Sequence, residues 1–261
     1  MSTRLPVVFV SHGAPDALLK APDTVEYWRT IGQTLPEPKG ILVVSAHWEA
    51  HQPTVSVATQ PTTIYDFSGF SPQLYSMKYP TPGAPELAKR VVSLLEPLGL
   101  KTGLNANRGL DHGAWVPLTA MYPFANIPVT QLSLTHHMDA TSHYEIGRAL
   151  APLRDEGILI IGSGAVTHNF GWLNWQAKSD QAPYPKASIF SEWVAHQIAE
   201  KNVSALFDYR SVPYGAESHP TEEHFMPLFV ALGAAGQDMA IRYQPSFAYG
   251  GLSMDAYLWQ E

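Results

Sequence analysis

The 261-residue sequence contains no cysteine, so disulfides, thiolate metal sites and cysteine nucleophiles are all excluded. Basic residues are few and scattered: 16 Lys and Arg stand against 23 Asp and Glu, which gives a net charge of −7. A nucleic-acid-binding surface is therefore not expected. No apolar run approaches the length that crosses a membrane, so the sequence predicts no membrane partner either.

The sequence also lacks a leader, repeats and linkers. It enters an apolar segment within a few residues of Met1 without the pattern of a secretory signal, so a cytoplasmic location is expected. No internal repeat or low-complexity tract divides the chain. With 45% hydrophobic residues, a chain of this length is sufficient for one large core. We therefore expect a single domain over residues 1–261.

The sequence is rich in short aliphatic runs that alternate with amphipathic segments. Uninterrupted, β-branched runs are typical of strands buried on both faces of a sheet, and they occur at 5–10, 40–44, 127–134 and 157–161. An alternating segment at 54–58 is expected to pair antiparallel with a neighbour. Helices are predicted at 17–35, 85–95, 116–122, 143–153, 187–201 and 224–232. This alternation predicts the α/β class, with a central, mostly parallel or mixed sheet flanked by helices.

Histidines follow three of these runs. His12 comes after the first run and His168 comes a few residues after the last. His47 follows Ser45 and Ala46, where small residues predict a close turn at the end of the strand. In open α/β sheets ligands bind beyond the carboxyl ends of the strands, and histidine is the commonest metal-ligating side chain. Each ring alone could be a core or capping residue, but together they predict an active site with a metal at this edge.

Two further histidines are candidates for the same site. His112 lies between Asp111 and Gly113, and the glycine permits close backbone approach. His224 lies one turn before the apolar positions of a helix, where a polar ring should face a site or a buried partner. The other six are weaker candidates: His219 is expected to cap a helix, His136 and His137 to lie in a turn, and solvated or locally bonded rings are expected at His51, His143 and His196.

The common metal and cofactor signatures are missing from the sequence. It has no His-Glu-x-x-His, and without cysteine it has no structural zinc pair. Gly162-Ser163-Gly164 lacks the spacing of a serine-hydrolase elbow and of a dinucleotide-binding loop. Histidines that converge from distant strand ends suit imidazole-binding metals such as zinc or iron. The residues alone therefore predict a mononuclear metalloenzyme with a histidine-rich site.

Short motifs along nearly the whole chain carry a specific resemblance. In chain order they are Ser11-His12-Gly13-Ala14-Pro15, Val44-Ser45-Ala46-His47-Trp48, Ile64-Tyr65-Asp66-Phe67 with Gly69-Phe70, Tyr79-Pro80-Thr81-Pro82-Gly83, Asp111-His112-Gly113-Ala114-Trp115, Ser163-Gly164 with His168-Asn169, Pro220-Thr221-Glu222-Glu223-His224 and Leu252-Ser253-Met254. No single motif is decisive. In this order, the set resembles the class III extradiol ring-cleaving dioxygenases, in the 4,5-DOPA dioxygenase extradiol branch.

The resemblance implies a non-haem Fe(II) held by His12, His47 and His224, which binds both oxygens of a catechol and O2. His168 would be the acid–base residue, and His112 would bond the oxygen intermediate or a substrate hydroxyl. Both atoms of O2 would enter a product whose ring is opened beside the diol. Since the usual facial triad has two histidines and one carboxylate, a third histidine leaves the metal site more positive. Zn(II) could therefore occupy the same site.

Other features leave alternatives open. Four aromatic residues could wall a slot for a flat ring or pack in the core: Trp48, Tyr65, Phe67 and Trp115. The segment 61–85, rich in proline and aromatic residues, is either a functional loop or lid or a surface loop held by its own aromatic rings. No motif places a cation against a substrate carboxylate; Arg108 and Lys186 are the candidates.

Two other functions fit the same residues. One is a zinc-dependent hydrolase on the same fold, which would consume no O2. The other is a non-catalytic relative that binds a ligand or partner in the histidine pocket. His168 could also be a fourth metal ligand. The sequence predicts a small aromatic diol and O2 as partners and leaves the oligomeric state unknown.

Overall fold

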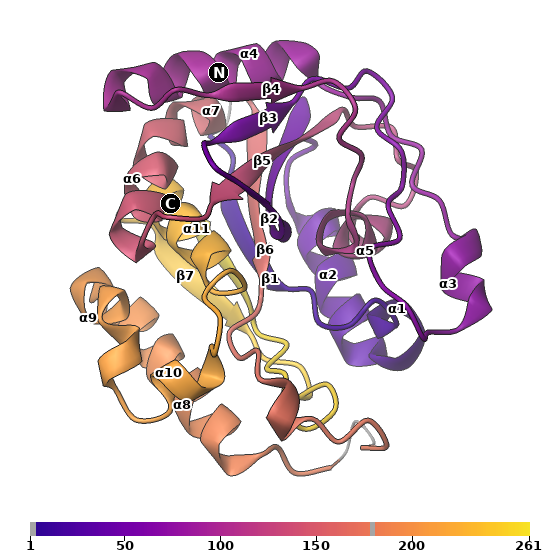
Figure 1. Ribbon diagram of the computed structural model, residues 1–261, viewed down its shortest axis with the longest axis vertical. Coiled ribbons are helices and arrows are strands. Elements are labelled where there is room, and N and C mark those ends of the chain that lie inside the picture. The colour runs from indigo at the N-terminus through magenta and orange to yellow at the C-terminus, as the bar shows by residue number, and fades with distance from the viewer. Residues whose placement is uncertain (1–3, 178–180) are drawn as a thin grey trace.

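The computed structural model describes residues 4–177 and 181–261, and within them one mixed sheet has helices on both faces (Figure 1). The strand order is β4-β3-β5-β2-β6-β1-β8-β7. The strands are β1 (Val7–Ser11), β2 (Gly40–Ala50), β3 (Thr54–Ser56), β4 (Gly103–Asn105), β5 (Val129–Thr135), β6 (Ile158–Gly164), β7 (Met239–Tyr243) and β8 (Ala256–Gln260). The central strands β5, β2, β6 and β1 are parallel, whereas β8 pairs antiparallel with β1 and β7. The predicted α/β class is confirmed, and β3 pairs antiparallel with β5 as expected.

Helices form a layer on each side of the sheet (Figure 1). One face is covered by α1 (Ala17–Lys20), α2 (Pro22–Thr34) and α5 (His112–Met121). The other is covered by α4 (Pro85–Leu95), α6 (Ala140–Leu150), α7 (Pro152–Asp155), α8 (Pro185–Ala199), α9 (Val203–Phe207) and α11 (Met226–Ala235). The short helices α3 (Pro72–Ser76) and α10 (Gly215–Ser218) lie in connecting segments. No helix among the described residues is both long and apolar enough to cross a bilayer.

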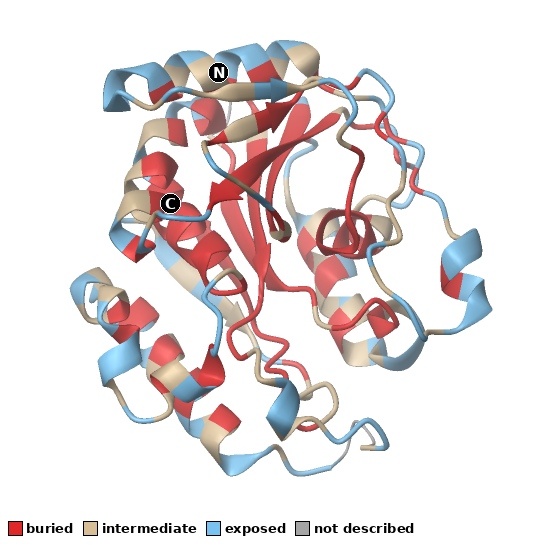
Figure 2. Cartoon of the chain, viewed as in Figure 1, coloured by how far each residue is buried: buried red, intermediate tan, exposed pale blue. Residues whose placement is uncertain are grey.

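Alternate residues of the central strands enter two separate hydrophobic cores. In β1, Val7 and Phe9 pack on the α11 side, while Val8 and Val10 pack on the α5 side. All four side chains are fully buried, as the red central strands of Figure 2 show. This explains why the sequence shows continuous aliphatic runs: a strand covered on both faces has no solvent side that favours polar residues.

Two helices begin or break where local chemistry dictates, which corrects the predicted bounds. The helix expected over 17–35 is two helices, α1 and α2, separated at Ala21. Pro22 is the first residue of α2, and a residue before proline is disfavoured in helical conformation. The helix expected over 116–122 begins at His112, because the Asp111 carboxylate accepts the N–H of Ala114 and caps it.

A third helix also begins earlier than expected. The helix predicted over 143–153 begins at Ala140, where Asp139 accepts the N–H of Ser142 as an N-cap, and it breaks before Pro152 into α6 and α7. The other helices predicted from periodicity are confirmed as α4, α8 and α11, with small shifts at their ends.

Strand β2 does not end at Ser45 and Ala46, as the small residues suggested. It continues to Ala50, and its pairing with β5 is interrupted between Val44 and Glu49. An interruption of this kind bends a strand and re-aims its side chains. His47 lies inside this irregular stretch.

Helix α11 is buried on all sides, whereas the sequence predicted one buried face. It packs between α6 and the sheet, and its N-terminal approach touches β6 through backbone atoms. A Cβ on Gly164 would lie 2.1 Å from the carbonyl oxygen of His224, which also accepts the N–H of Ala165 at 2.8 Å. Only glycine at position 164 allows this approach, which fixes His224 against the end of β6.

Candidate metal centre and active site

Three histidines from distant parts of the chain meet at the carboxyl ends of the central strands. His12 directly follows β1, His47 lies in the irregular part of β2, and His224 lies two residues before the start of α11. The Nε2 atoms of His12 and His47 are 2.9 Å apart, and those of His47 and His224 are 3.3 Å apart. The three rings form a group whose ligand atoms all lie within 4.8 Å of one another.

The other nitrogen of His12 is held by a serine and, through it, by a proline in a helix. Pro117 lies inside α5 and has no N–H, so the carbonyl of Gly113 is left without its helical donor. The Ser163 hydroxyl donates to that carbonyl, so its oxygen can only accept at the 3.0 Å contact with His12 Nδ1. This network assigns the His12 proton to Nδ1 and leaves a lone pair on Nε2.

Carboxylates face the Nδ1 atoms of the other two rings. Glu223 Oε1 lies 2.9 Å from Nδ1 of His224 and also accepts the hydroxyl of Thr221 at 3.0 Å. Asp66 Oδ2 lies 3.5 Å from Nδ1 of His47. A carboxylate favours a proton on the nitrogen that faces it, so both rings, like His12, direct an Nε2 lone pair toward the common point.

This donor set fits a metal ion. Two nitrogens that each lie about 2.0–2.1 Å from one ion stand about 2.8–3.4 Å apart at bond angles between about 90° and 109°. The separations of 2.9 and 3.3 Å agree with that range. Burial, with neighbouring rings, lowers the pKa of His12 and His224 well below the ordinary value and that of His47 to about 4. The rings are therefore neutral near pH 7, the form that binds metals.

His112 lies beside this group, with its ring centroid 3.9 Å from that of His47. Its partner is Asp66 rather than the adjacent Asp111. Asp66 Oδ1 accepts the backbone N–H of His112 at 3.0 Å and lies 3.0 Å from its Nδ1, although the ring contact lacks hydrogen-bond angles. Burial alone would raise the pKa of Asp66, but the contacts with His112 and His47 outweigh it and lower the pKa to about 2.

His168 lies against the opposite side of the group. Its ring stacks on that of His224, with centroids 3.4 Å apart and planes 9° from parallel. Its backbone N–H donates to the carbonyl of Ser218 at 2.9 Å. Burial is the main cause that lowers the pKa of His168 to about 4, so the ring is a neutral proton acceptor near pH 7. A nitrogen of His168 lies within 4.8 Å of potential ligand atoms of Glu223 and His224, but His168 is not part of the group formed by His12, His47 and His224.

A pocket of about 240 Å³ opens on these rings. Its wall combines polar groups of the site with apolar and aromatic side chains. The residues that line it are Gly13, Ala14, Pro15, His47, Asp66, Phe67, Ser68, Phe70, His112, His168, Phe170, Trp175, His224 and Leu252. The pocket thus combines aromatic side chains that suit a flat ring with the imidazole rings of the site.

Comparisons with known proteins agree with this site. Residues 6–257 match the family described as the catalytic LigB subunit of aromatic ring-opening dioxygenase. The chain belongs to this family. It is therefore an aromatic ring-opening dioxygenase, and the enzymes of the LigB family depend on a metal.

Individual relatives of this LigB-family chain are similar over most of their length. It is 46% identical over 236 residues to a 4,5-DOPA dioxygenase extradiol of Beta vulgaris, covering 88% of this chain and 87% of the relative. It is 41% identical over 257 residues to one of Escherichia coli strain K12, covering 97% and 94%. A solved structure of an uncharacterized E. coli K12 protein matches with a TM-score of 0.80 at 36% identity, covering 98% of this chain and 100% of that one.

The aromatic wall of the LigB-family pocket differs from the predicted one. Of the four aromatic residues proposed from the sequence, Phe67 lines the pocket. Trp115 is fully buried in the α5-side core and donates its indole N–H to the carbonyl of Ile64, because a buried indole needs an acceptor. Trp48 packs against Arg108, and the hydroxyl of Tyr65 donates to Met77. Segment 61–85 supplies Asp66, Phe67, Ser68 and Phe70 to the pocket.

The two cations suggested for a substrate carboxylate do not line this pocket. Arg108 donates to the carboxylate of Asp111 at 2.6 Å and to the carbonyl of His47, so it supports the site from behind. Lys186 pairs with Glu217 at the surface. Both guanidinium and ammonium groups are occupied by partners that the sequence alone does not reveal.

The remaining histidines lie outside the group. His219 does not cap the following helix α11, whose N-cap is Phe225; it is the C-cap residue of α10, and it is fully buried with its Nε2 2.9 Å from the carbonyl of Val166. His143 is buried and locally bonded to the carbonyl of Asp139. His51, His136, His137 and His196 are exposed. Part of the 170–185 stretch, in which the sequence shows no clear periodicity, lies outside the described residues (178–180).

The sequence does not indicate the roles of three residues that support the site: Ser163, Asp66 and Glu223. Asp66 and Glu223 belong to motifs that carry the family resemblance, which was the available signal, but nothing in their spacing names the ring that each one faces. Asp111 has a further role. It is fully buried and binds Ser45 at 2.7 Å and Gln131 at 2.9 Å, which ties α5 to β2 and β5 below the histidines.

Proposed function

We propose that this protein opens the ring of a catechol beside its two hydroxyls, using O2, and that DOPA-like catechols are its substrates. Two relatives named 4,5-DOPA dioxygenase extradiol support the substrate class, since each aligns over most of both chains. The observation that carries the proposal is the convergence of three neutral imidazoles, two of them buried and that of His47 partly buried, on one point beside an aromatic pocket. Two further histidines stand at the wall of the same pocket.

We assign the metal to His12, His47 and His224. Fe(II) is the ion expected for activity, and Zn(II) suits the same three nitrogens. When bound, the metal would supply a single centre at which a catechol and O2 meet. The chain contributes the fixed orientation of the rings, because Ser163 and Glu223 hold the Nδ1 atoms of two of them.

His168 is proposed as the proton acceptor. Its lowered pKa, about 4, means that the ring enters the reaction without a proton and can take one from a catechol hydroxyl as the substrate binds. The same nitrogen can return the proton when the ring opens. Stacking on His224 keeps the imidazole at a fixed distance from the metal group, which limits the geometry in which this transfer occurs.

His112 is proposed to hydrogen-bond oxygen atoms of the substrates. It is held by Asp66, which lies between His112 and His47, so one carboxylate orients a metal ligand and a catalytic ring together. The aromatic side chains of the pocket wall offer apolar surface to the ring of the substrate. We further propose that residues 1–261 act as a single catalytic domain; a cytoplasmic location stays a prediction from the sequence.

The test is O2 consumption by metal-free protein reconstituted anaerobically with Fe(II) and then given L-DOPA or simple catechols. We expect uptake and a yellow ring-opened product with iron, and neither with zinc. The matched variants are His168→Ala and His196→Ala, since His196 is exposed on α8 and outside the group. No uptake across the catechols, with one iron bound per chain, would favour a hydrolase or a ligand-binding protein instead.

A further inference from the structure

The histidine pocket adjoins a second cavity. This cavity, of about 460 Å³, shares Ser68, Phe70 and Trp175 with the histidine pocket. Its far side is formed by Asp16, Leu19, Lys20, Gly69, Ser71 and Tyr249. A substituent that extends past Phe70 and Trp175 from an aromatic ring bound near the histidines would therefore reach a cavity with charged walls. We call Asp16, Lys20 and Tyr249 the charged triad.

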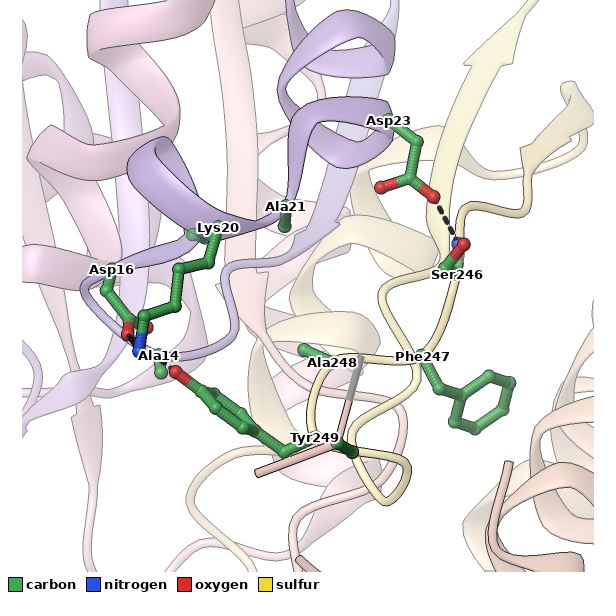
Figure 3. A pocket seen from close by; sticks show the side chains of 11 residues that line it. Ala14, Asp16, Lys20, Ala21, Asp23, Ser246, Phe247, Ala248 and Tyr249 are labelled. Carbon is green, nitrogen blue, oxygen red and sulfur yellow. Dashed lines mark hydrogen bonds and ion pairs between the residues drawn. The ribbon is translucent and has the colours of Figure 1, made fainter. Parts of the chain in front are cut away.

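The charged triad is a connected polar group (Figure 3). Asp16 Oδ2 accepts the hydroxyl of Tyr249 at 2.5 Å and lies 2.8 Å from the ammonium of Lys20. The Asp16 side chain is 4% exposed, whereas that of Lys20 is 64% exposed. Burial, followed by the contact with Asp16, raises the pKa of Tyr249, so its hydroxyl keeps the proton that it donates. The buried carboxylate is thus held in place while the cation faces open space.

Both cation and carboxylate have unused bonding capacity. An ammonium has three N–H donors, and among the described residues Asp16 is the one hydrogen-bonding or ion-pairing partner found for Lys20. No hydrogen bond to Oδ1 of Asp16 is found within the described part of the chain either. Among the described residues, no lysine or arginine lines the histidine pocket, and Lys20 is a cation that a ligand extending from that pocket would meet.

The backbone fixes the charged triad relative to the histidines. Ala14 and Pro15 line the histidine pocket, and Asp16 is the next residue, with its Cα about 3.8 Å from that of Pro15. Tyr249 has a φ of +52°, a conformation that non-glycine residues adopt rarely and that persists where the surroundings enforce it. Its turn is closed by two hydrogen bonds between Ala248 and Leu252, and Leu252 lines the histidine pocket.

We propose that Asp16, Lys20 and Tyr249 form the subsite for the charged side chain of the aromatic substrate, with Lys20 binding its carboxylate and Asp16 its ammonium group. The assignment rests on the proposed function, since it takes a ring-bearing substrate to be seated at the histidines. Lys20 and Asp16 carry one positive and one negative charge. They therefore match an α-amino-acid group on the substrate, which carries one carboxylate and one ammonium. A substituent with only a carboxylate would meet the Asp16 charge uncompensated, and one with only an ammonium would meet Lys20.

The test compares Lys20→Met with Lys89→Met. Both lysines lie on helices, are about equally exposed (64% and 66%) and pair with a carboxylate within one turn, at 2.8 and 2.7 Å, but Lys89 is on α4, away from the cavity. Zinc-loaded protein is titrated anaerobically with L-DOPA and with 4-methylcatechol, which lacks the charged groups. We expect Lys20→Met to raise the ratio of the L-DOPA Kd to the 4-methylcatechol Kd by about tenfold to a hundredfold, and Lys89→Met to leave it unchanged.

Two more ligands identify which charge each residue binds. Lys20→Met should weaken 3,4-dihydroxyphenylpropionate, which has only the carboxylate, and Asp16→Asn should weaken dopamine, which has only the ammonium. Equal Kd changes for L-DOPA and 4-methylcatechol in Lys20→Met, or no change in either, would overturn the subsite. Because the titration needs no turnover, it tests the subsite even if the iron-loaded enzyme consumes no O2, a result that would instead overturn the proposed function.

Discussion

Replacing Ser163 by alanine tests how the chain prepares His12 for the metal. The serine hydroxyl donates to the carbonyl of Gly113 and accepts at the Nδ1 of His12. Without it, both partners stay buried and lose a hydrogen bond, which costs about 1–3 kcal/mol of folding free energy for each. Without the serine, the proton of the neutral His12 ring is also free to move from Nδ1 to Nε2. In the molecules where it does, Nε2 has no lone pair for the metal.

Loss of such a supporting contact typically lowers metal affinity about 10–100-fold, or about 1.4–2.7 kcal/mol. We expect a change of that size in Ser163→Ala when Zn(II) is titrated against a competing chelator at pH 7. Thermal unfolding of the metal-free protein measures the separate loss of stability. The two measurements distinguish a weakened site from a weakened fold.

Ser191→Ala is the matched control. Ser191 is a fully buried serine whose hydroxyl donates to Asp255 at 2.8 Å, and none of the hydrogen bonds found for it among the described residues reaches a histidine. It should lower stability by a similar amount and leave metal affinity unchanged. The reasoning is refuted if Ser163→Ala is folded and binds zinc within about twofold of the unmodified protein, since a tenfold loss is the minimum expected.

Three other outcomes are expected. Since the pKa of Asp66 is about 2 in the folded protein and ordinarily 3.8, its ionised form adds stability above about pH 4 that is lost as pH falls toward 2. The free energy of unfolding of metal-free Asp66→Asn, measured with denaturant, should therefore fall less steeply over that pH range than that of the unmodified protein. Parallel curves of unfolding free energy against pH would contradict this. His168→Ala should keep one metal per chain and lose turnover; loss of metal by elemental analysis would make His168 a ligand. A Cβ at Gly113 would lie 2.4 Å from Ser45 Oγ, so Gly113→Ala should cost about 1–3 kcal/mol, whereas Gly40→Ala, with its nearest atoms at 3.4 Å, makes ordinary contacts. Equal melting temperatures for the two glycine variants would contradict that expectation.

The sheet was predictable because its central strands are buried on both faces, which leaves long aliphatic runs in the sequence. The helix limits were less so. The start of α5 depends on the capping of Ala114 by Asp111, and β2 runs past Ser45 because an irregular pairing replaces the expected turn. Both features depend on contacts between distant segments. Asp111 is held by partners on β2 and β5, and the irregular stretch of β2 is defined by its pairing with β5.

The choice of His12, His47 and His224 as candidate ligands came from the family resemblance. A histidine site at one edge was predictable from the residues themselves, because His12, His47 and His168 follow aliphatic runs whose carboxyl ends share that edge. Their orientation was not. The proton position of His12 depends on Ser163, which is 151 residues away in the sequence, and the pocket wall depends on Trp175 rather than Trp48. Pairings between such distant residues leave no periodic trace in a single sequence. Asp66 and Glu223 were visible as parts of motifs, but their roles became clear only once the rings that they face were located.

The backbone contact between Gly164 and His224 has a consequence for metal exchange. In proteins such as zinc fingers the metal brings the ligands together, so its removal unfolds the chain. Here the position of His224 is set by glycine packing and by the hydrogen bond from Ala165, neither of which involves a metal. The site should therefore survive stripping and accept a different ion without refolding. Which metal occupies it in the cell would then be decided by supply and by relative affinity rather than by the ion present when the chain folded.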